Sequence, residues 1–552
     1  MNHPLKNAPA TTWDEYDAGW EAKRAAVTID GREELFAQLL NELTANESLS
    51  NKQYNQIVRH YAGRGLPFLS KSQVLAAYHQ LCDRGILSFD PNVRIMLQTK
   101  PTRSQAGVTV VTVLTKPYPC PGKCIFCPTD VRMPKSYLHD EPGAQRAERH
   151  AFDPYDQTAA RIRALEQIGH PADKIELLIL GGTWSSYRRD YQEWFVKRCL
   201  DAMNGVVAAT LVEAQELNAV GPRRNVGLVI ETRPDHIDMD ELRWFRHLGV
   251  TKVQIGIQSM DDRILALNKR GHDTQATREA IRLLRLAGFK IHAHWMPNLL
   301  GATPESDRED FGRLWSDPAI RPDELKIYPC MLLENADLYA YWQRGEYRPY
   351  SEEEVTELLI ACKVQVPPYV RLNRIIRDIP TTNVVAGMKK ANLRQLAQQR
   401  MKARGLWCRC IRCREIRREK LSIANCQLSI IHYETDATTE HFLQFVTDED
   451  RIAGFLRLSF PHQEMEHPLP ELAGTAMIRE VHIYGPALTL GEESKGEAQH
   501  IGLGSQLVKR AKEMAREAGY SRIAVISAIG TRHYYARHGF RPDGLYMTAD
   551  LD

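Results

Sequence analysis

Short apolar runs of strand length alternate with amphipathic, helix-like stretches through the middle of the chain, from Val108 to Pro329. The runs VTVVTVL, IELLIL, VGLVIE, KVQIGI, KIHAHWM and ELKIYP predict strands that begin near residues 108, 175, 226, 252, 290 and 324. Helical stretches such as DPYDQTAARIRALEQIG separate most of these strands. Because strands joined by right-handed helical crossovers lie parallel in one sheet, this alternation predicts an α/β fold, a partial (βα)6 barrel.

The chain changes character on both sides of this region. The first 95 residues are polar, and KSQVLAAYHQLCDRGIL shows helical periodicity before a glycine stop, which predicts a helical N-terminal extension. Beyond residue 421, the runs QLSIIHYE, HFLQFVT and RIAGFLRLSF are typical of antiparallel strands and predict a separate α+β domain. The sequence therefore predicts four parts, at residues 1–95, 96–387, 388–420 and 421–552.

Length and composition exclude several classes of protein. With 552 residues, 43% hydrophobic and 26% charged, the chain is large enough for several cores and is neither disordered nor fibrous. The N-terminus shows no basic start followed by an apolar run, and no segment approaches the roughly 20 apolar residues that span a bilayer. We therefore expect a cytoplasmic protein with no membrane partner.

The net charge of +3 is unevenly distributed along the chain. Residues 388–420 contain twelve Lys or Arg and two Glu, a local net charge of +10. A charge run is usually a solvated helix face, but the acidic residues that normally intersperse such a face are scarce here. This segment is therefore interpreted as a polyanion-binding region, whose expected phosphate contacts are Lys389, Lys390, Arg394, Arg400, Lys402 and Arg404.

Six of the eleven cysteines lie in two short clusters, which favours metal ligation in a reducing compartment over a disulfide framework. Cys120, Cys124 and Cys127 form a CxxxCxxC pattern on the loop after the first predicted strand, at the functional edge of a parallel barrel. A four-iron cluster held by three thiolates leaves one iron open for a substrate or cofactor. A zinc site whose fourth ligand lies elsewhere is the alternative.

The second cysteine cluster is Cys408, Cys410 and Cys413, inside the basic segment. Free thiols so close together among arginines would be reactive, so a bound zinc ion with a structural role in fixing the linker is the preferred interpretation. Cys426 is the nearest candidate for the fourth ligand, and a histidine or a water molecule is the next.

Polar residues follow the predicted strands at the same edge as the first cysteine cluster. Such residues are either helix caps or ligand contacts, and their alignment with the cysteine loop favours ligand contacts. Glycine lets backbone groups approach a ligand that a Cβ atom would block. The residues concerned are Gly181, Gly182 and Thr183 after the second strand, Glu231 and Arg233 after the third, Gln254 in the fourth and Lys326 in the sixth.

A glycine-rich turn opens a long amphipathic helix in the last part of the chain, in QHIGLGSQLVKRAKEMAREAG. Free backbone amides at the start of a helix bind pyrophosphate. The expected contacts are Gln499, Gly502, Leu503, Gly504 and Ser505.

The CxxxCxxC loop after the first strand, together with the GGT turn after the second, resembles the radical SAM enzymes. The resemblance implies a 4Fe-4S cluster on Cys120, Cys124 and Cys127, whose open iron takes the amino and carboxylate groups of S-adenosylmethionine. Reduction by an electron donor would then yield a deoxyadenosyl radical. Gly181 to Thr183, with Glu231, Arg233 and Gln254, would contact this cofactor, and Lys326 would position a charged substrate.

The strand AMIREVHIYG, the glycine turn, the strand RIAVIS and the helix TRHYYARHGF follow the order found in GNAT acetyltransferases. This resemblance implies acetyl-CoA with its pyrophosphate on the turn. Tyr535, or alternatively Tyr534, would then lie beside the sulfur atom. Glu480 and His482 alternate on one face of a strand and would contact the acetyl end or a water molecule.

A radical SAM barrel followed by a GNAT domain resembles the family of Elongator catalytic subunits, which carboxymethylate tRNA uridine. The resemblance runs from about Thr99 to the end and includes IETRPD, LKIYP, RDIP, NLRQLAQQRMK and RHYYARHGF. It implies that a radical formed on the acetyl methyl group adds to carbon 5 of the wobble uridine and that the thioester is then hydrolysed. The tRNA anticodon loop would be the partner of the basic segment.

The eukaryotic members of the family that the chain resembles have a wider first cysteine spacing and largely lack the second cluster. The resemblance therefore implies a bacterial or archaeal type, which would act without other Elongator subunits. Residues 1–95 are expected to bind tRNA, and intramolecular packing is the alternative. Two other functions stay open at this point. One is a protein lysine acetyltransferase with a scaffolding barrel, and the other is a nucleic-acid-binding protein whose two sites sense cofactors.

Overall fold

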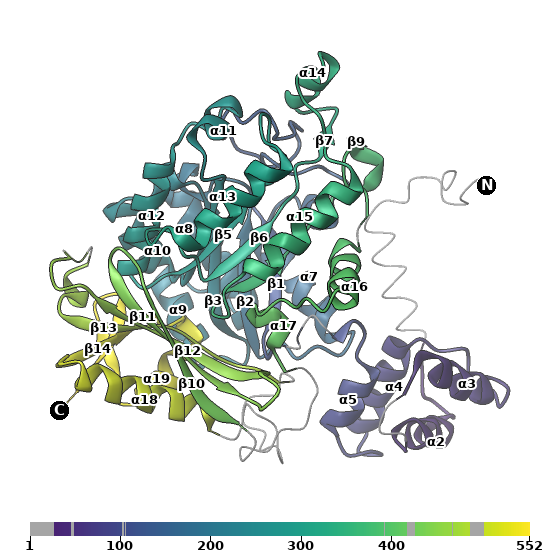
Figure 1. Ribbon diagram of the computed structural model, residues 1–552. Helices are drawn as coiled ribbons and strands as arrows, with labels where there is room; N and C mark the ends of the chain where they lie inside the picture. Colours follow the sequence, from purple (N-terminus) through teal and green to yellow (C-terminus); the bar gives the residue numbers. More distant parts are fainter. Residues whose placement is uncertain are drawn as a thin grey trace. The chain divides into compact units, whose positions relative to one another are not determined.

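The computed structural model describes residues 27–45, 49–101, 104, 106–390, 392–416, 426–465, 467, 469–485 and 502–551 (Figure 1). These residues form two compact units. The first takes in the described residues up to 104 together with residues 160–172. The second takes in residues 106–159 and the described residues from 173 onward.

The first unit is built from helices, as the sequence predicted. Ser50 and Ser70 cap two of the helices, and each forms a reciprocal capping box with the glutamine three residues later. Apolar side chains from all four helices, among them Phe36, Val58 and Tyr78, are buried in one shared core. The helices are α2 (Glu33–Thr44), α3 (Asn51–Ala62), α4 (Lys71–Asp83) and α5 (Pro91–Leu97).

The barrel sheet of the second unit is parallel throughout and has the strand order β1-β2-β3-β4-β5-β6-β8. All six predicted strands are present, so the α/β prediction is confirmed. A seventh strand was not predicted, because RLNR contains a single apolar residue. The strands are β1 (Thr109–Leu114), β2 (Lys174–Leu180), β3 (Arg224–Thr232), β4 (Lys252–Gln258), β5 (Lys290–Trp295), β6 (Glu324–Ile327) and β8 (Arg371–Arg374).

Helices connect these strands and cover the sheet, which curls as seen in Figure 1. A small two-stranded sheet, β7 (Leu332–Leu333) with β9 (Val384–Ala386), lies in the connections beyond β6. The helices are α6 (Pro142–Arg149), α7 (Pro154–Glu166), α8 (Arg189–Asn204), α9 (Leu211–Val220), α10 (Met239–Leu248), α11 (Asp262–Leu267), α12 (Thr274–Leu286), α13 (Pro304–Ser316), α14 (Leu338–Gln343), α15 (Glu352–Gln365), α16 (Leu393–Ala403) and α17 (Ile411–Arg414).

The C-terminal sheet has the order β10-β11-β12-β13-β14-β16-β15, and only β13 and β14 run parallel. Their pairing ends at Ile478 and Val525, where β14 itself ends, whereas β13 continues for five more residues. The elements are β10 (Gln427–Glu434), β11 (Thr438–Val446), β12 (Ile452–Pro461), β13 (Thr475–Ile483), β14 (Arg522–Val525), β15 (Arg541–Asp543), β16 (Tyr546–Asp550), α18 (Leu503–Glu517) and α19 (Arg532–Ala536).

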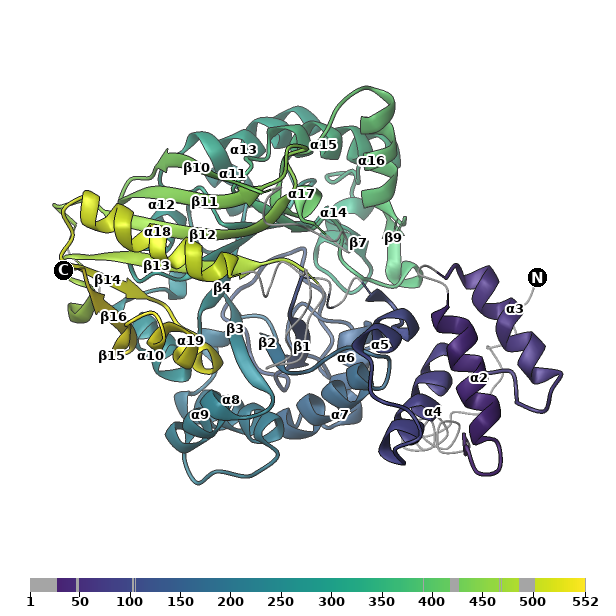
Figure 2. The ribbon, with the colours of Figure 1, turned by 90° about the horizontal axis from the view of Figure 1, so that it is seen from below.

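A buried network of charges joins the two sheets, which lie next to each other in Figure 2. The Arg479 guanidinium on β13 donates two hydrogen bonds of 2.7 Å to Asp323, the residue before β6, and one of 2.7 Å to Glu440. Arg457 on β12 lies 3.4 Å from the same aspartate. Burial alone would raise the pKa of Asp323, but Arg479 and Arg457 outweigh it and hold that pKa below its usual range.

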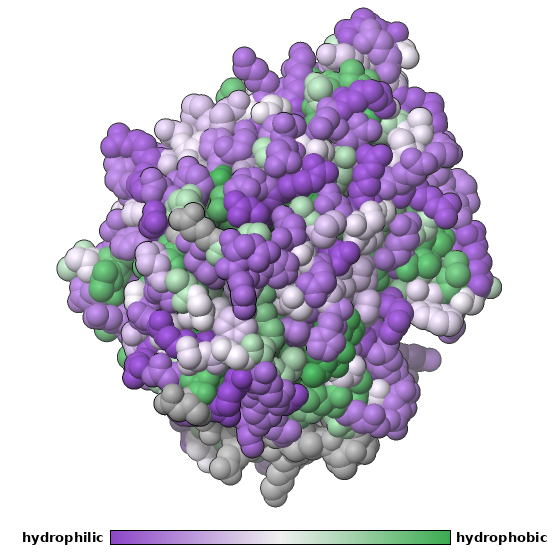
Figure 3. Space-filling view, turned by 60° about the vertical axis from the view of Figure 1, so that its left-hand side comes forward, coloured by the Kyte–Doolittle hydropathy of each residue, from purple (hydrophilic) through white to green (hydrophobic). Residues whose placement is uncertain are grey.

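The face shown in Figure 3 is mainly hydrophilic, with small hydrophobic groups of residues scattered over it. Among the described helices, none combines the length and the apolar character needed to cross a lipid bilayer.

Replacing Arg479 by Met should lower the free energy of unfolding by about 3–5 kcal/mol, because two buried carboxylates lose their closest counter-charge. Urea-induced unfolding measures the effect. Arg541→Met is the matched control, since Arg541 pairs with Asp550 where both side chains are exposed, and it should cost about 1 kcal/mol or less. Equal stabilities of the two variants would contradict the assigned role of the buried network.

Two candidate active sites in the second unit

The first cysteine cluster lies on the loop after β1, where all three residues line one pocket. The Gly122 amide donates to Cys120 Sγ at 3.4 Å, and Arg270 Nη1 donates to Cys124 Sγ at 3.3 Å. A hydrogen bond from Cys127 and the positive charge of Arg270 lower the pKa of the Cys124 thiol. The thiolate form, which is the form that binds metal, is therefore favoured at Cys124, whereas the same hydrogen bond and burial raise the pKa of Cys127.

The spacing of these three sulfur atoms suits a cluster better than a single ion. Among the described residues, only the second cysteine cluster brings three ligand atoms within 4.8 Å of one another. The sulfurs of Cys120, Cys124 and Cys127 therefore do not all lie within that distance, although Cys124 and Cys127 are hydrogen-bonded to each other. A tetrahedral zinc ion, with Zn–S bonds of about 2.3 Å, needs its sulfurs roughly 3.8 Å apart. The wider arrangement fits a 4Fe-4S cluster, which has several irons to bridge.

The glycine turn after β2 lies beside this loop. Gly181 has φ +146°, and a Cβ atom there would stand 1.8 Å from Thr115 Oγ1. Gly182, with φ +88°, and Thr183 line the pocket, and Thr183 Oγ1 lies 3.5 Å from Cys120 Sγ. The structure thus brings the predicted turn to the cysteine loop and leaves no room for larger side chains at Gly181.

Glu231 and Arg233, at the end of β3, also line the pocket. Burial raises the pKa of Glu231, whose carboxylate accepts a hydrogen bond of 3.3 Å from the Tyr137 hydroxyl. Arg233 forms two hydrogen bonds with Asp235, but its buried Nη1 has no hydrogen-bond partner among the described residues. This unpaired donor and the glycines suit an anionic, backbone-contacting ligand such as the methionine end of S-adenosylmethionine.

The structure places Gln254 and Lys326 deeper in the barrel. Gln254 Oε1 accepts hydrogen bonds from Lys326 Nζ and from His294 Nε2, the latter at 2.9 Å. His294 itself lines the pocket and lies 3.8 Å from Glu231. Gln254 and Lys326 therefore do not line the pocket themselves. His294 lies between them and the pocket.

Sequence reasoning missed three residues that shape the pocket: Arg270, His294 and Arg377. Arg270 lies in the NKRGHD stretch that follows α11, and a basic residue in that position was the available signal. Arg377 lies in RDIP and donates to Glu141 at 2.8 Å and to Ser136 Oγ at 3.0 Å. Its place in the pocket could not be predicted from the sequence, because its hydrogen-bond partners are more than 200 residues away along the chain.

The predicted pyrophosphate turn forms the start of α18. Gly502 is the residue before the helix and has φ +75°, so glycine is favoured there. A Cβ atom on Gly504 would stand 2.7 Å from the Tyr534 hydroxyl. Leu503 and Ser505 occupy the first turn of the helix, and Gln499 lies outside the described residues.

The two candidate tyrosines differ in position. Tyr534 reaches the turn, where its ring lies 4.8 Å from that of His538. Tyr535 is buried against Phe540 at 5.8 Å, and burial raises the pKa of its hydroxyl. The structure therefore places Tyr534 at the turn and Tyr535 in the interior beside it.

Glu480 and His482 lie on the part of β13 that extends beyond the end of β14. Glu480 pairs with Lys290 of the barrel and with Arg457, the latter at 2.9 Å. His482 Nε2 donates to the Ala106 carbonyl at 2.9 Å. Burial lowers the pKa of His482 to about 4, so the ring is neutral near pH 7. Both predicted acetyl contacts are thus held by residues of the barrel region.

A line of buried polar groups continues from Glu480 into the barrel. Lys290 Nζ lies 3.5 Å from Glu324, and the other oxygen of that carboxylate lies 3.1 Å from His292 Nδ1. The His292 and His294 rings are 5.6 Å apart. The line thereby connects β13 of the C-terminal sheet with the cysteine pocket.

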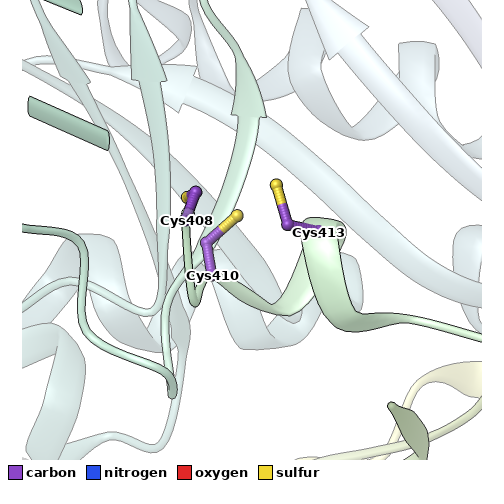
Figure 4. A group of neighbouring side chains, drawn as sticks. All are labelled: Cys408, Cys410 and Cys413. Carbon is purple, nitrogen blue, oxygen red and sulfur yellow. The ribbon is translucent and has the colours of Figure 1, made fainter. Parts of the chain in front are cut away.

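The second cysteine cluster converges at the start of α17, as Figure 4 shows. The sulfurs of Cys408, Cys410 and Cys413 lie within 4.8 Å of one another, which suits one tetrahedral ion. The sulfur of Cys426 is not part of this group of described residues. Lys363 Nζ lies 3.9 Å from Cys413 Sγ and offsets thiolate charge.

Part of the basic segment is neutralised by helix α15, which begins with three glutamates. Lys390 pairs with Glu352 at 2.7 Å, Arg400 with Glu353 at 2.6 Å and Arg404 with Glu357 at 2.6 Å. Arg394 is turned inward and donates to the Leu372 carbonyl at 3.0 Å. Lys389 and Lys402 are exposed. In the folded structure, helix α15 therefore supplies the acidic residues that the basic segment lacks in its own sequence.

Comparison with known proteins agrees with this geometry. The chain matches the Radical SAM superfamily over residues 118–313, the Radical SAM C-terminal domain over residues 322–403 and the acetyltransferase (GNAT) family over residues 412–540. It is 39% identical over 538 residues to the tRNA uridine(34) acetyltransferase of Methanocaldococcus jannaschii, which covers 94% of this chain and 97% of that protein.

Two other relatives and one solved structure also match most of this chain. The tRNA uridine(34) acetyltransferase of Dehalococcoides mccartyi is 42% identical over 462 residues, 82% of this chain and 100% of that protein. Human Elongator complex protein 3 is 35% identical over 473 residues, 82% of this chain and 86% of that protein. The solved structure of Methanocaldococcus infernus Elp3 with an N-terminal deletion superimposes with a TM-score of 0.70 and 39% identity, covering 81% of this chain and 99% of that one.

The radical SAM match decides between iron and zinc at the first cysteine cluster, and it implies a 4Fe-4S cluster with S-adenosylmethionine. The GNAT match implies acetyl-CoA. The chain is a radical SAM and GNAT enzyme that belongs to the family of tRNA uridine(34) acetyltransferases and Elongator complex protein 3.

Proposed function

We propose that the protein modifies the wobble uridine of tRNA by adding a carboxymethyl group, derived from acetyl-CoA, to carbon 5. One observation carries the proposal: the cysteine pocket and the part of β13 that extends beyond β14 belong to one unit and are joined by the buried pair of Glu480 and Lys290. Two catalytic domains held together in this way suit one reaction with two cofactors.

The residues of the cysteine pocket have separate tasks in this proposal. Cys120, Cys124 and Cys127 would hold the 4Fe-4S cluster, and Gly182 and Arg233 would hold the methionine end of S-adenosylmethionine. When bound, these cofactors supply the one-electron chemistry that activates an unreactive methyl C–H bond. Such chemistry is needed because carbon 5 of uridine has no heteroatom to acylate and an acetyl methyl group is a poor electrophile.

The C-terminal sheet would bind the acyl donor. The backbone amides at the start of α18, from Leu503 to Ser505, would bind the pyrophosphate of acetyl-CoA. Tyr534 or Tyr535 would lie beside its sulfur. Exposed Lys389 and Lys402, together with the N-terminal helices, would contact tRNA phosphates. The cytoplasm is the proposed location.

A protein lysine acetyltransferase is the less favoured alternative. It requires a GNAT site that works without the barrel. Glu480 and His482, the residues expected at the acetyl end, are instead bound to Lys290 and Ala106 of the barrel region. This dependence argues against a GNAT domain that acts alone.

Nucleoside mass spectrometry tests the proposed reaction directly. Reconstituted protein is incubated without oxygen with tRNA, a reductant, S-adenosylmethionine and acetyl-CoA labelled in the methyl group. The label should appear on uridine as a carboxymethyl group. Formation of deoxyadenosine with unmodified uridine would mean that the radical acts on another substrate, and it would overturn the proposal.

Replacing Cys124 by Ala should abolish uridine modification, because the pocket loses one cluster ligand. The dissociation constant for tRNA, measured by filter binding, should change less than about twofold, since phosphate contacts dominate affinity. Cys199→Ala is the matched control, because Cys199 is buried in α8 outside the pocket, and it should keep its activity. A large loss of tRNA binding in Cys124→Ala would contradict this division of tasks.

We also propose that Cys408, Cys410 and Cys413 bind zinc. The purified protein should contain roughly one zinc ion per chain, and Cys410→Ser should remove it. Elemental analysis by inductively coupled plasma mass spectrometry measures both. Cys426→Ser is the matched control, because its sulfur lies outside the group, and it should keep its zinc. Full zinc content in Cys410→Ser would exclude this site.

A further inference from the structure

Three tyrosine rings stack next to the cysteine loop, and the last ring has a free face. Tyr118 stacks on Tyr187 with ring centres 4.8 Å apart and planes 29° from parallel, and Tyr187 stacks on Tyr191 at 5.3 Å and 22°. Tyr118 is 36% exposed. Among the residues that the structure describes, no second ring and no cation is stacked on Tyr118. The stack therefore ends in an aromatic face that is open to a ligand.

Hydrogen bonds hold these rings in place before any ligand binds. Tyr187 is buried, and its hydroxyl donates to the Lys116 carbonyl at 2.8 Å and lies 2.7 Å from Thr115 Oγ1. The Lys116 amide donates to the Tyr191 hydroxyl at 3.1 Å. Because the ring beneath Tyr118 is fixed to the first barrel strand and its loop, a ligand that stacks on Tyr118 meets an ordered surface. Little conformational freedom is then lost on binding.

The stacked rings lie at the edge of the cysteine pocket. Tyr118 stands two residues before Cys120, which lines the pocket. Tyr187 stands four residues after Thr183, which also lines the pocket, and the Tyr187 hydroxyl lies 3.4 Å from the Gly181 carbonyl. The rings thus adjoin both the cysteine loop and the glycine turn. A group stacked on Tyr118 would lie next to a substrate that enters the pocket.

The lysines around Tyr118 are free of acidic partners. Lys116 and Lys123 are exposed, and no carboxylate of the described residues pairs with either of them. Lys135 lines the pocket and donates to the Thr129 hydroxyl at 2.7 Å. Unpaired lysines on both sides of an open aromatic ring suit an RNA strand, whose phosphates they attract while the ring contacts a base.

The reaction proposed above removes one base from its stack. The target uridine must turn out of the anticodon loop to reach the pocket, so the base beside it loses a stacking partner. An aromatic ring at the pocket edge can take the place of that partner. Tyr118 offers one face only, because Tyr187 covers the other. This geometry suits one base that stacks on the end of the rings and excludes insertion of the ring between two bases.

We propose that Tyr118 stacks on the unpaired nucleobase beside the target uridine, while Lys116 and Lys123 attract the flanking phosphates. This inference rests on the proposed function, because it assigns one contact of the tRNA substrate. Tyr118 has no part in the chemistry of the reaction. Its stacking holds the neighbouring nucleotide in place while the uridine occupies the pocket.

Fluorescence of tRNA that carries 2-aminopurine on either side of the target uridine tests the proposal, since stacking quenches this base. The reductant is left out, so that no reaction takes place. In the complex with the natural protein, one of the two positions should stay quenched. In the complex with Tyr118→Ala, the same position should become brighter. Tyr118→Phe keeps the ring, and its complex should match that of the natural protein.

The dissociation constant for tRNA gives a second readout. It should rise roughly tenfold in Tyr118→Ala and change less than about twofold in Tyr118→Phe. Trp194→Ala is the matched control, because Trp194 is 42% exposed and lies at the far end of the same rings, 5.6 Å from Tyr191. It should leave the fluorescence at the quenched position unchanged. If Tyr118→Ala loses iron, Tyr118→Leu replaces it, with the same expected brightening.

Equal fluorescence and equal affinity of Tyr118→Ala and the natural protein would overturn the proposal and leave the surface to a protein partner. An equal brightening in Trp194→Ala would also overturn it, because the effect would not belong to the ring at the pocket edge. Both readouts are taken without turnover. A failure of this inference is therefore distinct from a failure of the proposed function, which would show as unmodified uridine in the natural protein.

Discussion

The position of the two catalytic domains depends on one buried carboxylate. Asp323 stands immediately before β6 of the barrel sheet and accepts hydrogen bonds from Arg479 on β13, while Arg457 on β12 lies within ion-pair distance. A buried ion that loses its partner is strongly destabilising. The two sheets therefore cannot slide or separate without exposing these charges. The contacts between these charged side chains thus fix the position of the two candidate sites relative to each other.

Because these charges hold the two sheets together, residues next to Arg479 are able to contact both domains. Glu480 pairs with Lys290, and from there the polar line runs through Glu324 and His292 to His294 in the cysteine pocket. Barrel interiors are usually filled by branched apolar side chains. Charged groups in this place cost stability, so we attribute them to the connection between the sites rather than to the fold itself.

The strands and the two cysteine clusters were predictable because both leave local patterns. Six strands are apolar runs of ordinary length, whereas β8 contains only Leu372 as an apolar residue and was missed. The charge of the basic segment was overestimated from sequence, because Glu352, Glu353 and Glu357 come from a helix some 40 residues earlier. Arg270 was missed for the same reason: its contact with Cys124 joins residues 146 positions apart.

The two cysteine clusters differ in how closely their sulfur atoms lie, and this difference suits them to different kinds of metal site. In the CxxxCxxC loop the three thiols are spread around a pocket that glycines keep open, with Arg270 against one sulfur. In the second cluster the CxCxxC spacing folds three sulfurs within 4.8 Å of one another at a helix start, two of them on buried cysteines. A wide, accessible set of thiolates leaves room for a further ligand, whereas a tight, covered set closes around one ion. Three cysteines are therefore arranged to suit a reactive cluster in one loop and a structural ion in the other.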